Sequence, residues 1–89
     1  MTTRSVIVPN QLGMHARAAA KFVHAASAFA SHVRVARGHR VMDGKSIMGI
    51  LLLAAPRGAL ITVSAEGPDE VAAVETLCRL VESGFGEEL

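Results

Sequence analysis

Two hydrophobic spacings alternate along this chain, and their alternation constrains the fold more than any other feature. Every-other-residue spacing is typical of half-buried strands, and spacing of three or four residues is typical of amphipathic helices. Gly, Pro and Asn separate the segments. Strands are expected at 4–9, 33–36, 40–42 and 60–66, and helices at 16–29, at 47–55 and from 68 to just before Gly84. The order βαββαβα predicts an α/β (α+β) open-faced sandwich, in which a four-stranded antiparallel sheet carries three helices on one face.

Length and composition narrow the possible functions. With 89 residues, the chain is expected to form a single domain, residues 1–89. Aromatic residues are only 3%, all Phe, so the chain has few side chains that could stack on nucleic-acid bases. The longest apolar run, 47–56, contains Gly49 and is too short to cross a bilayer. We therefore expect no nucleic-acid partner and no membrane insertion. The lone Cys78 and the absence of a visible signal peptide fit the cytoplasm.

Charge is divided unevenly along the chain. Residues 1–42 hold six Lys and Arg, all four His and no acid, whereas residues 43–89 hold three Lys and Arg and all eight acids, so the formal charges are +6 and −5. The fold could bring the halves together so that they compensate each other. Alternatively, the first half could present a basic face around the first helix that docks acidic partners. The pattern leaves both open.

The most unusual local feature is the start of the first helix. A turn over 10–13 is followed by an alanine-rich segment that is expected to be helical. His15 lies at the junction, and Arg17 lies in the first turn of the expected helix. A cation at a helix N-terminus is unfavourable, and the first acid in the sequence is as far away as Asp43. A phosphate on or beside His15 would meet both the free N–H groups of the helix start and the guanidinium of Arg17. The residues therefore predict a site that holds phosphate, and a neutral imidazole there is a suitable nucleophile.

Other candidate sites are weaker. His24, His32 and His39 have no helical pair spacing and no acid or Cys to complete a ligand set, so they are interpreted as solvated, and no metal or cofactor is expected. Ser46 is a suitable N-cap for the helix over 47–55 and could alternatively be a site of phosphorylation. Ile47 and Met48 could belong to the core or, if exposed, to a surface that accommodates several partners.

The segment from Asn10 to Lys21 resembles the active-site motif of the HPr family, the histidine-containing phosphocarriers of the bacterial phosphoenolpyruvate-dependent phosphotransferase system. The segment 44–49 resembles the regulatory-serine motif of the same family, and the spacing, the length, the element order and the turn over 52–58 agree with it. The resemblance covers essentially the whole chain. The tail over 83–88 looks more like the nitrogen-related branch and proteobacterial relatives than like the sugar-transport branch of Gram-positive bacteria. Ala18 departs from the proline that many members have there.

The resemblance implies a carrier component of a phosphotransferase system and no stand-alone catalyst. His15 would accept a phosphoryl group from enzyme I at Nδ1 and pass it to EIIA-type proteins, for sugar uptake or regulation, and Arg17 would stabilise the phosphate. Ser46 would be the target of HPr kinase/phosphorylase in organisms that have that enzyme. The docking surface for partners would comprise Ala16, Ala20, Ile47, Met48 and Leu51, with part of its charge on Lys21. The unit would be a monomer. The alternative is a purely regulatory HPr-like binding module controlled through Ser46.

Overall fold

The computed structural model describes residues 1–87, and its elements follow the predicted order. They are β1 (Thr2–Ile7), α1 (Ala16–Ser27), β2 (His32–Arg37), β3 (Arg40–Asp43), α2 (Ile47–Leu52), β4 (Leu60–Glu66), α3 (Glu70–Glu82) and a short 3-10 helix, η1 (Gly84–Gly86). The four strands form one antiparallel sheet in the order β1-β4-β2-β3. This confirms the predicted open-faced sandwich.

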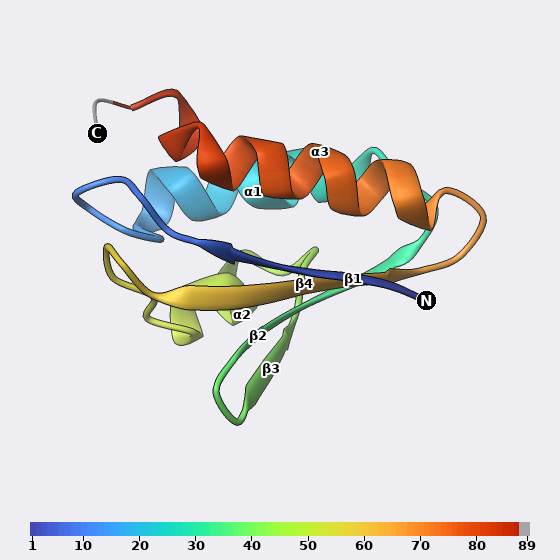
Figure 1. Cartoon of the computed structure of the whole chain (residues 1–89), viewed down its shortest axis with the longest axis horizontal. Helices are drawn as coiled ribbons and strands as arrows, with labels where there is room; N and C mark the ends of the chain where they lie inside the picture. Colours follow the sequence, from blue (N-terminus) through green and yellow to red (C-terminus); the bar gives the residue numbers. More distant parts are fainter. Residues whose placement is uncertain (88–89) are drawn as a thin grey trace.

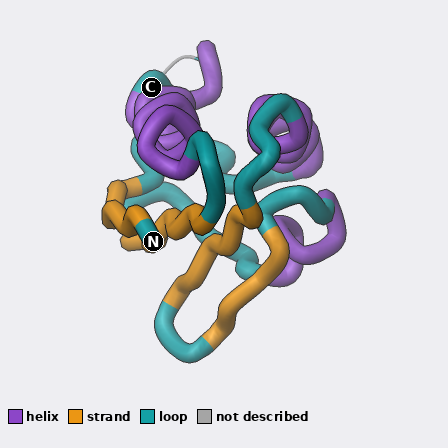
Figure 2. The backbone as a smooth tube through the Cα atoms, turned by 90° about the vertical axis from the view of Figure 1, so that its right-hand side faces the viewer, coloured by secondary structure: helices purple, strands orange, loops and turns teal. Residues whose placement is uncertain are grey.

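The helices cover the sheet in a row. α3 packs over β1 and β4, α2 lies against β3, and α1 packs between α3 and α2. Figure 1 shows α1 and α3 running along the strands, and Figure 2 shows them side by side, with α2 beyond α1. The loop between β1 and α1 lies at the same end of the molecule as the C-terminal segment (Figure 1).

The sheet has one buried and one open face because its strands alternate in the predicted way. Apolar residues on the covered face are buried, and polar residues on the other face bond to each other across strands, as Ser5 does with Thr62 at 2.9 Å. The buried core residues of the sheet are Val6, Val33, Val35, Ile61, Val63 and Ala65. The helices add small and aliphatic residues together with Phe22, and η1 adds Phe85.

Several element boundaries differ from prediction for local reasons. α1 ends at Ser27 and α2 at Leu52, shorter than the predicted 16–29 and 47–55. In both cases the next N–H groups bond to carbonyls three residues back, which tightens the chain out of the α-helix, and Ala54 then has φ +50°. β1 covers 2–7 instead of 4–9, in register with β4.

The helical spacing of Val71, Val74, Leu77 or Cys78, and Val81 in the sequence predicts one apolar stripe on α3. For Val71 this prediction was wrong. Val71 is 60% exposed, whereas Ala73, Val74, Leu77, Cys78 and Val81 are buried. At about 100° per residue, Val71 falls at the edge of the arc that these residues define, and α3 begins only one residue earlier. Gly84 has φ +69°, as predicted for the residue that ends this helix.

Candidate functional site

The turn before α1 is anchored to another turn of the same chain, the one between α2 and β4. Asn10 is fully buried, and its side-chain Nδ2 donates to the Gly13 carbonyl at 2.8 Å. Gly13 has φ +64°, and a Cβ there would lie 2.4 Å from the Ala55 carbonyl oxygen. The Met14 N–H donates to the same oxygen at 2.9 Å. The start of α1 is therefore held against the turn between α2 and β4.

His15 is the N-cap of α1. Its backbone is extended, and Nδ1 of its ring accepts from the Arg17 N–H at 3.3 Å. This distance is long for a hydrogen bond, and histidine is not among the favoured N-cap residues. The Nδ1 lone pair therefore faces the free N–H groups of the helix and is only weakly used by the protein.

The other ring nitrogen of His15 meets an acid from the far end of the chain. Nε2 contacts the Glu87 carboxylate, whose other oxygen accepts from Asn10 Nδ2 at 2.9 Å. An acid is thus next to the histidine after all, which corrects the expectation that none compensates the charge of this helix start. The hydrogen bond from Asn10 is the main cause that lowers the pKa of Glu87, and the contact with His15 adds to it.

The C-terminal segment is folded onto the site by Phe85. This side chain is buried, with φ +59° between Gly84 and Gly86, which both have positive φ. Lys21 Nζ donates to the Phe85 carbonyl at 2.7 Å. The Lys21 ammonium, predicted to serve partner docking, therefore also holds the segment that delivers Glu87.

Arg17 lies beside His15 in an open depression of about 610 Å³. The depression is lined by Gln11, Leu12, His15, Ala16, Arg17 and Glu87. Among residues 1–87, no acid or carbonyl accepts a hydrogen bond from the Arg17 guanidinium. The site therefore combines an imidazole, backbone N–H groups and an uncommitted guanidinium, which together can hold a phosphate.

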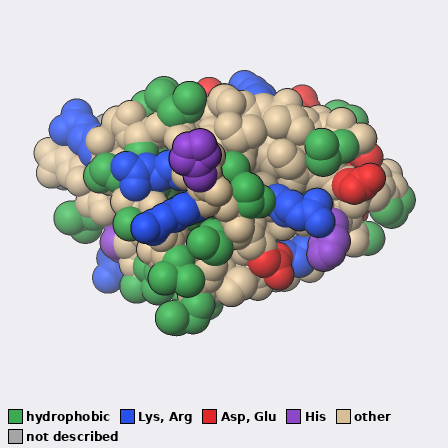
Figure 3. All heavy atoms as spheres, turned by 90° about the horizontal axis from the view of Figure 1, so that it is seen from below, with side chains coloured by type: hydrophobic (Ala, Val, Ile, Leu, Met, Phe, Trp, Pro, Cys, Tyr) green, Lys and Arg blue, Asp and Glu red, His purple; other side chains and the backbone are tan. Residues whose placement is uncertain are grey.

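The uneven charge of the sequence is partly compensated. Within the described range, two ion pairs join the halves, the terminal amine with Glu70 and Arg4 with Glu82, and the Glu87 carboxylate contacts the His15 ring. The arginines of β2 and β3 remain outside these pairs. On the face toward which the β2–β3 hairpin points, Lys, Arg and His side chains lie among hydrophobic ones (Figure 3). The two halves thus compensate each other in part, and docking of acidic partners on a basic face stays a prediction.

Ser46 is the N-cap of α2, as predicted. Its Oγ accepts from the Gly49 N–H at 3.1 Å, and the side chain is half-buried. Neither Ile47 nor Met48, which follow it, is a core residue: Met48 is 67% exposed. The hydroxyl therefore lies at the edge of an exposed apolar surface.

The predicted docking residues come together on α1 and α2, which pack against each other. Ala16, Ala20, Ile47 and Met48 are exposed, whereas Leu51 is half-buried and packs on the core. Leu52, at 53% exposure, and Leu12, at 72%, are exposed apolar residues that the sequence reasoning did not single out.

Proteins of one known family resemble this chain over nearly its whole length. Residues 2–83 match the family described as the PTS HPr component phosphorylation site. The chain belongs to the HPr family. The phosphocarrier protein HPr of Cupriavidus necator is 44% identical over 87 residues, which are 98% of each chain, and that of Neisseria meningitidis is 42% identical over the same length. The crystal structure of HPr-C-His from Thermoanaerobacter tengcongensis has a TM-score of 0.96 at 44% identity and covers all of both chains. That of the HPr from Bacillus anthracis has a TM-score of 0.87 at 36% identity, covering 90% of this chain and 95% of that one.

Membership of the HPr family supports a phosphocarrier role in the phosphotransferase system and implies partners such as enzyme I and EIIA proteins. Within residues 1–87, no helix is long and apolar enough to cross a membrane. In the same range, no three His, Cys, Asp or Glu side chains gather as a metal site would require. His24, His32 and His39 are exposed, as predicted.

Glu87 is the residue of this site that the sequence did not lead us to predict. The signal was present in the tail, where a phenylalanine between two glycines precedes the acids. A large apolar residue in such a turn indicates that the tail packs back on the domain. Glu88, which belongs to the tail compared above with the nitrogen-related branch, lies outside the described residues.

Proposed function

We propose that this protein carries a phosphoryl group on Nδ1 of His15, accepting it from phosphorylated enzyme I and passing it to EIIA-type proteins in the cytoplasm as a monomer. The observation that carries the proposal is the position of His15. Its Nδ1 lies at the start of α1, 3.3 Å from the Arg17 backbone N, in a depression that the Arg17 side chain also lines.

The chemistry of transfer fits these groups. The Nδ1 lone pair forms a bond to phosphorus, and the bond from phosphorus to the donor breaks, with its electron pair leaving on the donor atom. Little covalent help is needed for this step, because positioning and charge stabilisation supply most of the rate. The helix N–H groups and the Arg17 guanidinium supply that stabilisation to the phosphoryl oxygens.

The site should hold phosphate only loosely, which suits a carrier. A single exposed guanidinium binds the group, and the depression is open to solvent. Charge interactions at such exposed positions are weak because water screens them. The phosphorylated protein can therefore give up the group to the next component.

The test is phosphorylation by enzyme I and labelled phosphoenolpyruvate. Wild-type protein should acquire one acid-labile, alkali-stable phosphate. His15→Ala should abolish the label, whereas His24→Ala, which removes an exposed histidine from the same helix, should leave it unchanged. Absence of label on wild-type protein with a cognate enzyme I would contradict the proposal.

A second candidate function is regulation through Ser46. A phosphate on its Oγ would lie at the start of α2 beside the exposed Met48, where its charge would oppose acidic partners. Ser46→Asp should then slow phosphorylation of His15 by enzyme I, while Ser46→Ala should only destabilise the fold, by about 1 kcal/mol, through loss of the cap. If partner control in cells survives His15→Ala and is lost with Ser46→Ala, the regulatory module is the better description.

A further inference from the structure

We propose that Glu87 is a positioning residue for His15: its carboxylate holds the ring through Nε2–H and leaves Nδ1 as the nitrogen that accepts phosphate. The inference rests on the proposed function of His15. It adds a residue 72 positions away in the sequence to the machinery of that site.

The carboxylate is held from two sides. One oxygen contacts His15 Nε2, and the other accepts from Asn10 Nδ2 at 2.9 Å. Asn10 cannot move easily, since it is fully buried and its Nδ2 also donates to the Gly13 carbonyl. The side chains of His15 and Glu87 are only 24% and 19% exposed, so the contact is partly shielded from water.

The segment that carries Glu87 is itself fixed. Phe85 is buried in the core, Lys21 Nζ donates to the Phe85 carbonyl at 2.7 Å, and the Glu87 N–H donates to the Gly84 carbonyl at 3.0 Å. Three successive residues, Gly84 to Gly86, have positive φ, which turns the chain sharply after α3. The carboxylate thus reaches His15 on a closely packed turn.

The contact selects one form of the ring. In a neutral imidazole, one nitrogen carries the proton and the other is an acceptor. Nδ1 accepts from the Arg17 N–H, and Nε2 faces a carboxylate, so the proton is assigned to Nε2. A carboxylate on the second nitrogen of a histidine fixes its orientation and increases the basicity of the first. The lowered pKa of Glu87 keeps this carboxylate ionised at neutral pH.

The same carboxylate balances charge after transfer. When Nδ1 has bonded to phosphorus and Nε2 has kept its proton, the ring carries a positive charge, and no proton has had to leave. Glu87 then lies beside that charge. Because it contacts the opposite edge of the ring from the phosphorus atom, it does not occupy the place of the phosphoryl group.

The experiment compares Glu87→Gln with Glu75→Gln, a matched change at an exposed glutamate of α3. The second-order rate of phosphorylation by enzyme I should fall about 10-fold in Glu87→Gln, the lower end of the effect of removing a histidine-orienting partner, and stay unchanged in Glu75→Gln. A role in packing alone would leave Glu87→Gln at the wild-type rate, because glutamine has nearly the same shape.

A second readout needs no phosphate donor. In nitrogen-15 NMR, wild-type protein should show a His15 Nε2–H protected from exchange with water, and Glu87→Ala should lose that protection. If wild-type protein is labelled and Glu87→Gln reacts equally fast, the role of Glu87 is overturned while the proposed function stands. The same holds if labelled wild-type protein shows no protected ring N–H. Wild-type protein that takes no label would instead contradict the proposed function.

Discussion

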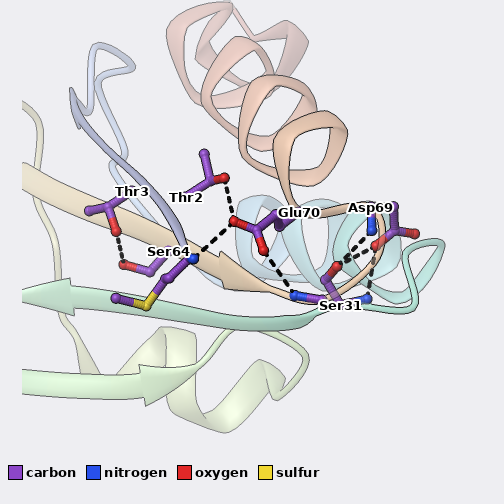
Figure 4. Close-up of polar contacts among 8 residues, drawn as sticks. Thr2, Thr3, Ser31, Ser64, Asp69 and Glu70 are labelled. Carbon is purple, nitrogen blue, oxygen red and sulfur yellow. Dashed lines mark hydrogen bonds and ion pairs between the residues drawn. The ribbon is translucent and has the colours of Figure 1, made fainter.

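Two carboxylates at opposite ends of the molecule, Asp69 and Glu87, both bind groups that are distant in the sequence, but they have different roles. Asp69 accepts from the backbone N–H groups of Ala30 and Ser31, both at 2.9 Å, and from the Ser31 hydroxyl. Figure 4 shows this Asp69 cluster where the loop before α3 meets the loop before β2. Ser31 is buried, and its Oγ also accepts from the Asp69 N–H at 3.2 Å.

The difference lies in the partners. Asp69 is bound mainly by backbone groups of an adjoining loop, which cannot rotate away, so its contacts join two parts of the fold. Glu87 is bound by the side chains of Asn10 and His15, and His15 is the residue proposed to accept the phosphoryl group. A carboxylate that satisfies backbone donors contributes to stability, whereas one that orients a reactive ring contributes to function. The comparison predicts that changes at the Asp69 end affect unfolding and changes at the His15 end affect transfer.

The largest effect is expected from Arg17→Ala at the His15 end. Phosphoryl transfer from enzyme I should slow by about 100-fold, because one donor to the transition-state charge is lost. The free energy of unfolding should rise slightly, by about 0.3 kcal/mol, since a cation leaves a helix N-terminus. Kinetics with labelled phosphoenolpyruvate and urea unfolding measure the two quantities. Arg79→Ala, an exposed change on α3, is the control, and equal transfer rates for wild type and Arg17→Ala would break the comparison.

Gly67→Ala tests the Asp69 end. Gly67 has φ +150°, and a Cβ there would lie 2.7 Å from Ser31 Oγ and 2.8 Å from Ser31 Cα. The strained backbone and the collision should lower the free energy of unfolding by about 2–3 kcal/mol. Gly58→Ala is the matched control, because Gly58 has φ +87° with open space around it, and it should lose only about 1 kcal/mol. Transfer by the folded fraction should stay at the wild-type rate in both, and a slowed Gly67→Ala would mean that the two ends are coupled.

The smallest effect is expected in the pH dependence of stability. The hydrogen bond from the Ser31 side chain, followed by that from Ala30, lowers the pKa of Asp69 below its usual 3.8. The Asp69 carboxylate therefore binds a proton more readily in the unfolded chain than in the folded one. Its contribution to the free energy of unfolding is complete above about pH 4 and is lost as the pH falls through the folded pKa. Thermal unfolding from pH 7 to pH 2 should show a shallower acid decline in Asp69→Asn than in wild type. An unchanged decline would remove Asp69 from the stabilising groups.

Local features could be predicted from the sequence because they depend on neighbours in the chain. The alternation over 60–66 predicted β4 with its observed bounds. His15 and Ser46 were placed at helix starts because a turn or loop precedes each and an apolar run follows, and both are N-caps. The end of α2 was less predictable. The chain bends at Ala54. In addition, Arg40 donates to the carbonyl of the last helical residue, Leu52, and Arg37 donates to carbonyls of the turn that follows. These contacts come from neighbouring strands, so no local sequence pattern predicts them.

The sequence by itself determined the order of the elements, which residues of each strand face the core, and the placement of His15 and Arg17 together at the start of one helix. These follow from hydrophobic periodicity and turn residues, which act over a few positions. Only the tertiary structure decided that Glu87 meets His15 and that Lys21 holds the Phe85 carbonyl. Both contacts depend on the burial of Phe85 against residues far away in the sequence, so they appear only when the core has formed. The start of α1 has no acid nearby in the sequence, and in the folded protein Glu87 from the C-terminal segment lies beside it.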